Sequence, residues 1–311
     1  MVSEEPPVER NEAADINDLV DRLLRDLGGP EPPLDLDQVR DQQRLDLAYY
    51  SKTDLNLLDE MAHRARMAGN TILSTAKRMA EVVSQCGLRG LLMLREEEKK
   101  IFIDDDVAAL KRRFIIAHEV THDLLPWHRA LLLGDNEITL SPSCHQTMEA
   151  EANYGGRRLI FMGGRFRQEA RDCEFNWQSI EAFNKRYGNT LTTTLWQMVC
   201  ERDPAHPVFG MISRHPKHPE IGDRGDGQDV AHFIRSGGFR AHFANVSEGD
   251  AFNALRSYAS GKRRGPIGED ICIFTNMNGE PCDFQMYTFS NGYQLLTYGI
   301  FRGLHRIVVG F

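Results

Sequence analysis

Several features typical of exported and membrane proteins are missing from this 311-residue sequence. Its six cysteines lie between residues 86 and 282 without a Cys-x-x-Cys pair, so they do not form the dense disulfide framework of a small secreted domain. The first residues lack the basic and apolar segments of a signal peptide. No apolar run reaches about 18 residues, the length that a membrane helix needs. We therefore expect a reduced, cytoplasmic protein without a membrane span.

An excess of basic charge is also missing, since 37 Lys and Arg stand against 45 Asp and Glu. This balance argues against a generic nucleic-acid coat. The charge is unevenly distributed: residues 1–154 hold 18 basic and 29 acidic residues, a net charge of -11, and residues 155–311 hold 19 and 16, a net charge of +3. The chain is long enough for two or three folded units. The two halves are therefore expected to differ in character.

The pattern of residues divides the chain into four parts. Residues 1–14 are acidic, bear prolines and predict a disordered tail. Residues 15–165 predict a catalytic domain of helices with a small sheet, residues 166–203 a helical unit, and residues 204–311 a sensor or docking domain. The last part ends in alternating segments typical of an antiparallel sheet, with a hairpin signal at Asn291-Gly292. The predicted fold class is α+β.

Local signals place the first domain's elements. Residues 54–85 predict a helix, and Leu91–Ile103 predict two paired strands around a charged turn. A helix is expected after Asp104-Asp105-Asp106, whose carboxylates suit its positive N-terminal end. Another is expected from Ser141-Pro142 to about Phe161, although Gly155-Gly156 weakens its middle.

The strongest chemical signal is the segment His118-Glu119-Val120-Thr121-His122. Histidines four apart on a helix emerge from one face, so both imidazoles can reach one zinc ion. Glu119 is rotated by about 100° from His118, which suits a base that activates water rather than a metal ligand. The motif therefore predicts a catalytic zinc site with Glu119 as its base.

A catalytic zinc ion needs a third protein ligand, and residues 148–153 supply two candidates. Glu149 and Asn153 are four apart and share a helix face, so Glu149 is predicted to bind zinc while Asn153 accepts a hydrogen bond from a ligand histidine. Glu151 points about 200° away from Glu149, and we interpret it as a solvated helix charge. His145 lies one turn before Glu149 and is a candidate for a residue that hydrogen-bonds a metal ligand without binding the metal. A surface or helix-capping histidine is the simpler interpretation.

These residues resemble the ImmA/IrrE family of metallopeptidases. The resemblance rests on Arg113–His122, on Glu149-Ala150-Glu151-Ala152-Asn153 and on the Pro-x-Asp-Leu segment near residue 35, and it covers about residues 15–200. It implies a zincin-like domain in which His118, His122 and Glu149 bind Zn2+ and Glu119 is the catalytic base. It also implies a protein substrate: a helix-turn-helix repressor whose cleavage relieves repression during stress, DNA damage, mobile-element induction or phage defence.

The chain departs from the family pattern at three places. Gly155-Gly156 stands where the family has an aromatic residue and an alanine, Ile160-Phe161-Met162-Gly163 stands where it has a Leu-Met-Pro ending, and Thr121 replaces a common small residue. None of these changes removes a ligand or the base. They do bear on the shape of the floor of the cleft.

Other segments allow a functional and a plainer interpretation. Cys86 precedes the predicted strand pair, and its thiolate is a candidate for zinc's open position, although an ordinary buried cysteine is favoured. Residues 176–202 resemble a helix-turn-helix in outline, but their second helix is too apolar for DNA recognition, so we interpret them as a packing unit with repressor docking as the alternative. The histidines of residues 213–219 are interpreted as a polar loop rather than a second metal site.

Two classes of function are compatible with these features. The first is a site-specific regulatory metalloendopeptidase whose C-terminal half receives a nucleic-acid or small-molecule activating signal. The second is a metal-stabilised protein that sequesters a repressor or binds nucleic acid without cleavage. Intact Glu119 favours the first, because a binding protein needs no base.

Overall fold

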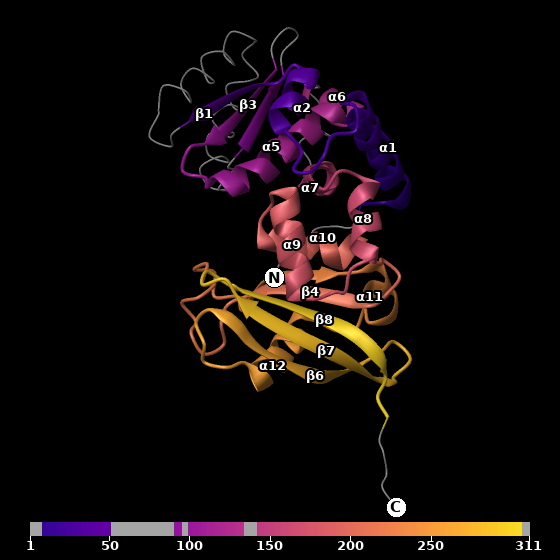
Figure 1. The fold of residues 1–311 in the computed structure, drawn as a ribbon, viewed down its shortest axis with the longest axis vertical. Coiled ribbons are helices and arrows are strands. Elements are labelled where there is room, and N and C mark those ends of the chain that lie inside the picture. Colours follow the sequence, from indigo (N-terminus) through magenta and orange to yellow (C-terminus); the bar gives the residue numbers. More distant parts are fainter. Residues whose placement is uncertain (1–7, 51–89, 95–98, 134–141, 307–311) are drawn as a thin grey trace, which may run out of the picture. The chain divides into compact units, whose positions relative to one another are not determined.

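The computed structural model describes residues 8–50, 90–94, 99–133 and 142–306 (Figure 1). Contacts between Cα atoms divide the chain into two compact units. The N-terminal unit comprises residues 6–163 and 186–189, and the C-terminal unit is built from residues 164–185 and 190–311. None of the described helices is both long and apolar enough to cross a membrane.

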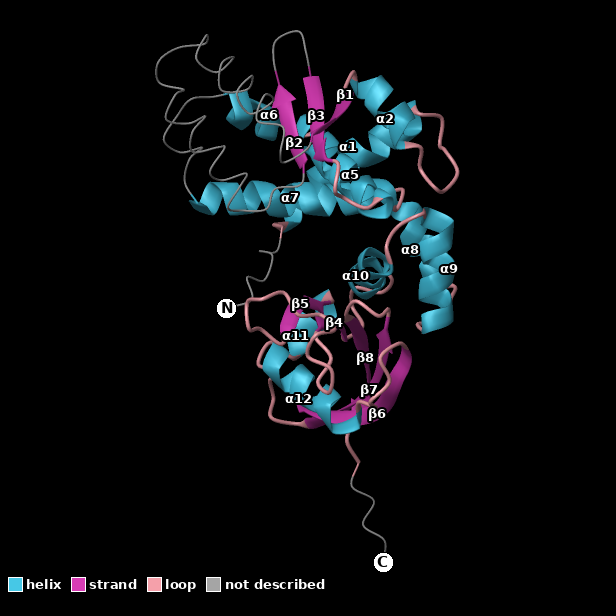
Figure 2. Ribbon diagram, turned by 90° about the vertical axis from the view of Figure 1, so that its left-hand side faces the viewer, coloured by secondary structure: helices cyan, strands magenta, loops and turns pink. Residues whose placement is uncertain are grey.

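The N-terminal unit combines helices with a small mixed sheet. Its elements are α1 (Arg10–Asp26), α2 (Leu36–Gln43), β1 (Asp46–Tyr50), β2 (Gly90–Leu94), β3 (Lys99–Asp104), α5 (Ala109–Leu124), α6 (Pro126–Leu133) and α7 (Pro142–Ile160). In the sheet, β3 is central, parallel to β1 and antiparallel to β2. Helix α5 packs against this sheet and against α7, and α1 packs on α7 (Figure 2).

Local sequence explains several of these elements. Helix α1 buries Ile16, Val20, Leu23 and Leu24, a set that recurs at helical spacing along one face. Asp35 caps the start of helix α2: its side chain accepts a hydrogen bond from the backbone N–H of Asp37 at 2.9 Å. The strand pair expected at Leu91–Ile103 is present as β2 and β3. The helix expected over residues 54–85 lies outside the described residues.

Two local expectations were wrong. Helix α1 begins at Arg10, so residues 10–14 are helical rather than part of a disordered tail. The acidic run 104–106 does not cap α5: no side chain caps that helix, which begins at Ala109. Instead the carboxylate of Asp104 accepts a hydrogen bond from the backbone N–H of Asp106 at 3.0 Å. Short acidic side chains readily form such a bond with the backbone two residues further along the chain.

The C-terminal unit is built around a five-stranded antiparallel sheet. Its strands are β4 (Val208–Ser213), β5 (Val230–Arg235), β6 (Gly265–Thr275), β7 (Pro281–Ser290) and β8 (Leu295–Leu304), in the order β5-β4-β8-β7-β6. The meander over β6, β7 and β8 was predicted, and the turn at Asn291-Gly292 joins β7 to β8. Strands β4 and β5 were not predicted. The sequence also predicts a strand over residues 306–311. This is wrong at Arg306, since β8 ends at Leu304, and residues 307–311 lie outside the described residues.

Helices cover both faces of this sheet. Helices α11 (Gly237–His242) and α12 (Glu248–Tyr258) enclose an aromatic core on one face; its fully buried phenylalanines include Phe209, Phe239 and Phe284. On the opposite face, α10 (Leu191–Glu201) lies against β4, where Val199 meets Gly210. The architecture is therefore α+β, with mixed helix and sheet in both units.

The helix-turn-helix-like segment belongs to this sheet-containing unit. Helices α8 (Gly164–Arg171), α9 (Trp177–Tyr187) and α10 follow the predicted order. The buried face of α10 includes Leu195, Met198 and Val199, and this face packs on the sheet. The expectation of a separate helical unit at 166–203 therefore differs from the structure, in which most of these residues join the C-terminal sheet in one compact unit.

Candidate metal centre

Helix α5 carries the first part of the site. His118 and His122 stand one turn apart on it, with ring centroids 4.8 Å apart, and Glu119 lies between them in sequence. The surrounding residues of the helix are buried, including Ala117, Val120 and Thr121. The two imidazoles are thus presented on one side of a helix whose neighbouring residues are packed into the interior of the unit.

Two glycines let α7 approach α5 closely. A Cβ atom built on Gly155 would lie 2.4 Å from Cγ2 of Thr121, and one built on Gly156 would lie 3.0 Å from the backbone nitrogen of His118. These glycines do not interrupt α7, which continues to Ile160. Two of the positions at which the sequence differs from the pattern it resembles are therefore neighbours in space: Gly155 makes room for the methyl group of Thr121. This close packing positions Glu149 relative to His118 and His122.

The metal-ligand atoms of three side chains converge at one point. The two Nε2 atoms of His118 and His122 are 3.1 Å apart. Oε2 of Glu149 lies 3.3 Å from Nε2 of His118, and its Oε1 lies 3.5 Å from Nε2 of His122. Zinc binds such atoms at about 2.0–2.2 Å in tetrahedral geometry, which separates two ligands by about 3.3–3.6 Å. The three side chains therefore fit a zinc ion in both chemistry and spacing.

Asn153 fixes the orientation of His118. Its Oδ1 lies 3.0 Å from Nδ1 of His118. An amide oxygen only accepts hydrogen bonds, so Nδ1 of His118 carries the proton and donates it. In the neutral ring the lone pair then belongs to Nε2, the atom that faces Glu149. This is the role that the spacing of Glu149 and Asn153 predicts for Asn153.

Glu119 is a buried carboxylic acid beside this cluster. Only 6% of it is exposed. Burial, reinforced by the charge of Glu149, raises its pKa to about 7, although His118 and a hydrogen bond from the backbone of Leu92 act in the opposite direction. A carboxylate with a pKa near neutrality can both accept and release a proton at physiological pH.

The charges of the cluster are strongly coupled. Burial lowers the pKa of His122 to about 4. Burial also acts to lower the pKa of His118, but the hydrogen bond to Glu149 and the charge of Glu119 outweigh it and raise that pKa. The contacts with both histidines hold the pKa of Glu149 far below its ordinary value, despite burial. Glu149 is therefore an anion over the physiological range, as a metal ligand must be.

Glu151 was interpreted wrongly as a solvated charge, because it is only 3% exposed. Its Oε2 accepts hydrogen bonds from Nε2 of His128 at 2.8 Å and from Nε1 of Trp127 at 2.6 Å. Helix periodicity correctly directs Glu151 away from Glu149. Periodicity could not show that α6 would bring Trp127 and His128 into contact with Glu151.

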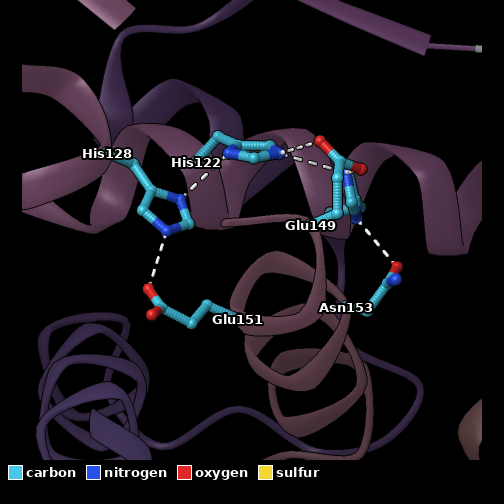
Figure 3. A network of polar contacts seen from close by, with 6 residues as sticks. His122, His128, Glu149, Glu151 and Asn153 are labelled. Carbon is cyan, nitrogen blue, oxygen red and sulfur yellow. Dashed lines mark hydrogen bonds and ion pairs between the residues drawn. The ribbon is translucent and has the colours of Figure 1, made fainter. Parts of the chain in front are cut away.

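His128 was not predicted from the sequence. It is fully buried, and its Nδ1 lies 2.9 Å from Nδ1 of His122 (Figure 3). Its position six residues after His122 was a usable signal, since some zinc peptidases place a third histidine ligand there after a glycine turn. This chain has Leu125 in place of that glycine, with extended backbone, followed by Pro126. His128 consequently contacts the far side of the His122 ring instead of joining Glu149.

Some predicted residues cannot be placed. Cys86 lies outside the described residues, and the side chain of His145 lies outside them too. In the loop after β4, Nε2 of His215 lies 3.0 Å from the carbonyl oxygen of Lys262, and Nε2 of His218 lies 2.9 Å from that of Gly261. These histidines tie two loops together, which agrees with a polar loop rather than a second metal site.

Comparisons with known proteins give little information about this chain. No family model matches it, and no curated protein matches it. Among solved structures, it is similar to one titled "Mycobacterium tuberculosis transcriptional regulator", at 11% sequence identity and a TM-score of 0.49 over 92% of this chain and 88% of that chain. A similarity of this size carries no argument about fold or function.

Proposed function

We propose that this protein is a zinc-dependent endopeptidase with His118, His122 and Glu149 as ligands and Glu119 as general base. The observation that carries the proposal is the mutual spacing of the three ligand atoms, 3.1–3.5 Å. These separations suit one tetrahedral zinc ion. The zincin-like character of the domain follows from this assignment and belongs to the same proposal.

A zinc ion bound there would polarise the scissile carbonyl group and a water molecule. Glu119 removes the proton from the attacking water on a carboxylate oxygen and delivers it to the departing amide nitrogen. Asn153 keeps His118 in the tautomer whose Nε2 is free to bind the metal.

The edge of the small sheet offers a place for an extended substrate. Strand β2 lies at one end of the strand order β1-β3-β2. The backbone of Leu92 bonds to the carboxylate of Glu119, so the edge of β2 that does not pair with β3 faces the catalytic base. A substrate strand that pairs with β2 would therefore pass beside Glu119. Strand pairing uses hydrogen bonds of the main chain, so the proposed substrate is a polypeptide rather than a small molecule.

The proposed substrate is a helix-turn-helix repressor, which rests on the resemblance to the ImmA/IrrE family. Because strand pairing gives little sequence selectivity, choice of this substrate requires docking elsewhere, and the C-terminal unit is the proposed docking or sensor region.

The test compares the cleavage of a purified helix-turn-helix repressor by wild type and by Glu119→Gln, each loaded with zinc. The amide keeps the shape of the carboxylate but cannot accept the water proton, so zinc and repressor binding are expected to persist while cleavage falls by at least about 100-fold. Asp123→Asn, a change at a buried carboxylate on the same helix, is the matched control and should still cleave. If zinc-loaded wild type binds the repressor without cleaving it, the protein is a metal-stabilised binding protein instead.

A further inference from the structure

A chain of buried hydrogen bonds runs from His122 to Glu151 behind the candidate metal site. His122 meets His128 through their Nδ1 atoms at 2.9 Å, and His128 meets Glu151 through Nε2 at 2.8 Å. His128 is fully buried and Glu151 is 3% exposed. Trp127 donates a second hydrogen bond to the same carboxylate oxygen at 2.6 Å. Water therefore does not compete for these bonds.

The carboxylate of Glu151, the last member of this series of hydrogen bonds, determines where the protons lie on the two histidines. An ionised Glu151 carboxylate only accepts, so Nε2 of His128 donates to it. In a neutral His128 ring, Nδ1 then has the lone pair and accepts the proton of Nδ1 of His122. The remaining lone pair of His122 lies on Nε2, the atom that faces Glu149 and His118. A doubly protonated His128 would reverse this order and leave a proton on Nε2 of His122, where no metal can then bind.

From this geometry we propose that His128, held by Glu151, is a positioning residue that fixes the tautomer and ring orientation of His122 for metal binding. The inference rests on the proposed zinc site and adds residues that the motif does not contain. Ligand histidines commonly donate their second ring nitrogen to a carboxylate. Here an imidazole stands between the ligand and the carboxylate, because α6 inserts His128 between α5 and α7.

The experiment measures the zinc affinity of the purified full-length protein by competition with a chromophoric chelator, a readout that needs no catalysis. His128→Leu removes the acceptor for Nδ1–H of His122 and should weaken zinc binding about 10–100-fold. His128→Gln offers an amide oxygen as a substitute acceptor and should recover most of this loss. The Co2+-loaded protein should show an altered visible spectrum for His128→Leu and a nearly restored spectrum for His128→Gln.

A double-mutant cycle tests whether Glu151 acts through His128. Glu151→Ala alone should weaken zinc binding about 10-fold, but it should add nothing in the His128→Leu background. The matched control is Asp123→Asn, which alters a buried carboxylate one residue from His122 that bonds Lys99 at 2.8 Å. This control is expected to change thermal stability while leaving zinc affinity within about twofold of wild type.

Three results would overturn the positioning role. Equal losses of zinc affinity in His128→Leu and Asp123→Asn would mean that only general stability is involved. Additive effects of Glu151→Ala and His128→Leu would mean that Glu151 does not act through His128. A loss in His128→Leu as complete as in His122→Ala would make His128 a ligand. Wild type that binds zinc but cleaves no repressor would contradict the proposed peptidase and leave the positioning role intact.

Discussion

The two units of this protein have interiors of different kinds. The N-terminal unit buries ionisable side chains, and among the described residues every buried carboxylate belongs to it: Asp104, Glu119, Asp123 and Glu151. The C-terminal unit buries aromatic rings around Phe209 and Phe284, and its buried polar groups are mostly hydroxyls and amides. Aromatic burial stabilises a fold directly, whereas buried charge costs stability unless it is fully paired. The aromatic interior therefore stabilises the C-terminal unit directly, whereas the charged interior of the N-terminal unit depends on pairing and includes residues of the proposed metal site.

The largest effect is expected in the aromatic interior. Phe284 is fully buried and its ring lies 4.9 Å from that of Phe243 and 5.4 Å from that of Phe274. Phe284→Ala should therefore lower the free energy of unfolding of the C-terminal unit by about 3–5 kcal/mol. Denaturant unfolding, with and without zinc, measures this change in the free energy of unfolding.

The control is Tyr293→Ala, since Tyr293 is 79% exposed and its loss should have little effect. Zinc affinity should be unchanged in both variants. A weakened zinc affinity in Phe284→Ala would show that zinc binding depends on the aromatic interior, and would contradict the separation of the two interiors.

A smaller effect of opposite sign is expected at Glu119. Its pKa in the metal-free folded protein is raised from 4.5 to about 7. Between these pH values the folded state holds a proton that the unfolded chain has released, so this group's contribution to stability falls as pH rises and the loss is complete above pH 7. Glu119→Gln lacks the titration and should be more stable than wild type at pH 8 by up to ~3 kcal/mol.

The measurement is urea unfolding of both metal-free proteins at pH 5 and pH 8. The stability difference between variant and wild type should grow with pH. A difference that is the same at both values would show that Glu119 is not held in an unfavourable charged state.

The smallest of these effects concerns the contact between α5 and α7. Gly155→Ala places a methyl group against Cγ2 of Thr121, whose hydroxyl is held at 2.8 Å from the carbonyl oxygen of Ala117. The substitution should destabilise the N-terminal unit by about 1–3 kcal/mol. In a Thr121→Ser background the closest contact is gone, although contacts of 3.1 Å with Cγ2 of Ile16 and 3.2 Å with the hydroxyl oxygen at position 121 remain. The same change should therefore cost much less there, because alanine favours helix over glycine by ~1 kcal/mol.

Thermal unfolding of the four proteins of this double-mutant cycle gives the coupling. Equal costs of Gly155→Ala in both backgrounds would show that the glycine is not required by Thr121.

The sequence predicted those parts of the site that depend on helix geometry alone. His118 and His122 share a face because they are four residues apart, and Glu149 and Asn153 share one for the same reason. The contact between His122 and His128 was not predictable in this way, because it depends on how the chain turns at Leu125-Pro126 and where α6 then packs. Periodicity indicates which way a side chain points and does not reveal what meets it there.

The same limit applies to the C-terminal sheet. Strand β7 alternates between buried and partly buried residues, a pattern with a period of two, and it was predicted. Strand β4 was missed because all six of its residues are buried, so that no alternation marks it. Its short apolar run lies in a region rich in proline, glycine and histidine, which favoured a loop interpretation.

The proposed function depends above all on His118, His122 and Glu149 together holding one zinc ion. X-ray absorption at the zinc edge of the loaded protein probes this directly, because it identifies the atoms bound to the metal and their distances. We expect one zinc ion per chain with two imidazole ligands and oxygen from Glu149 and solvent, at about 2.0–2.2 Å. Glu149→Ala should lose the protein oxygen and bind zinc much more weakly. A third imidazole, or a sulfur ligand at about 2.3 Å, would show that the ligand set is wrong.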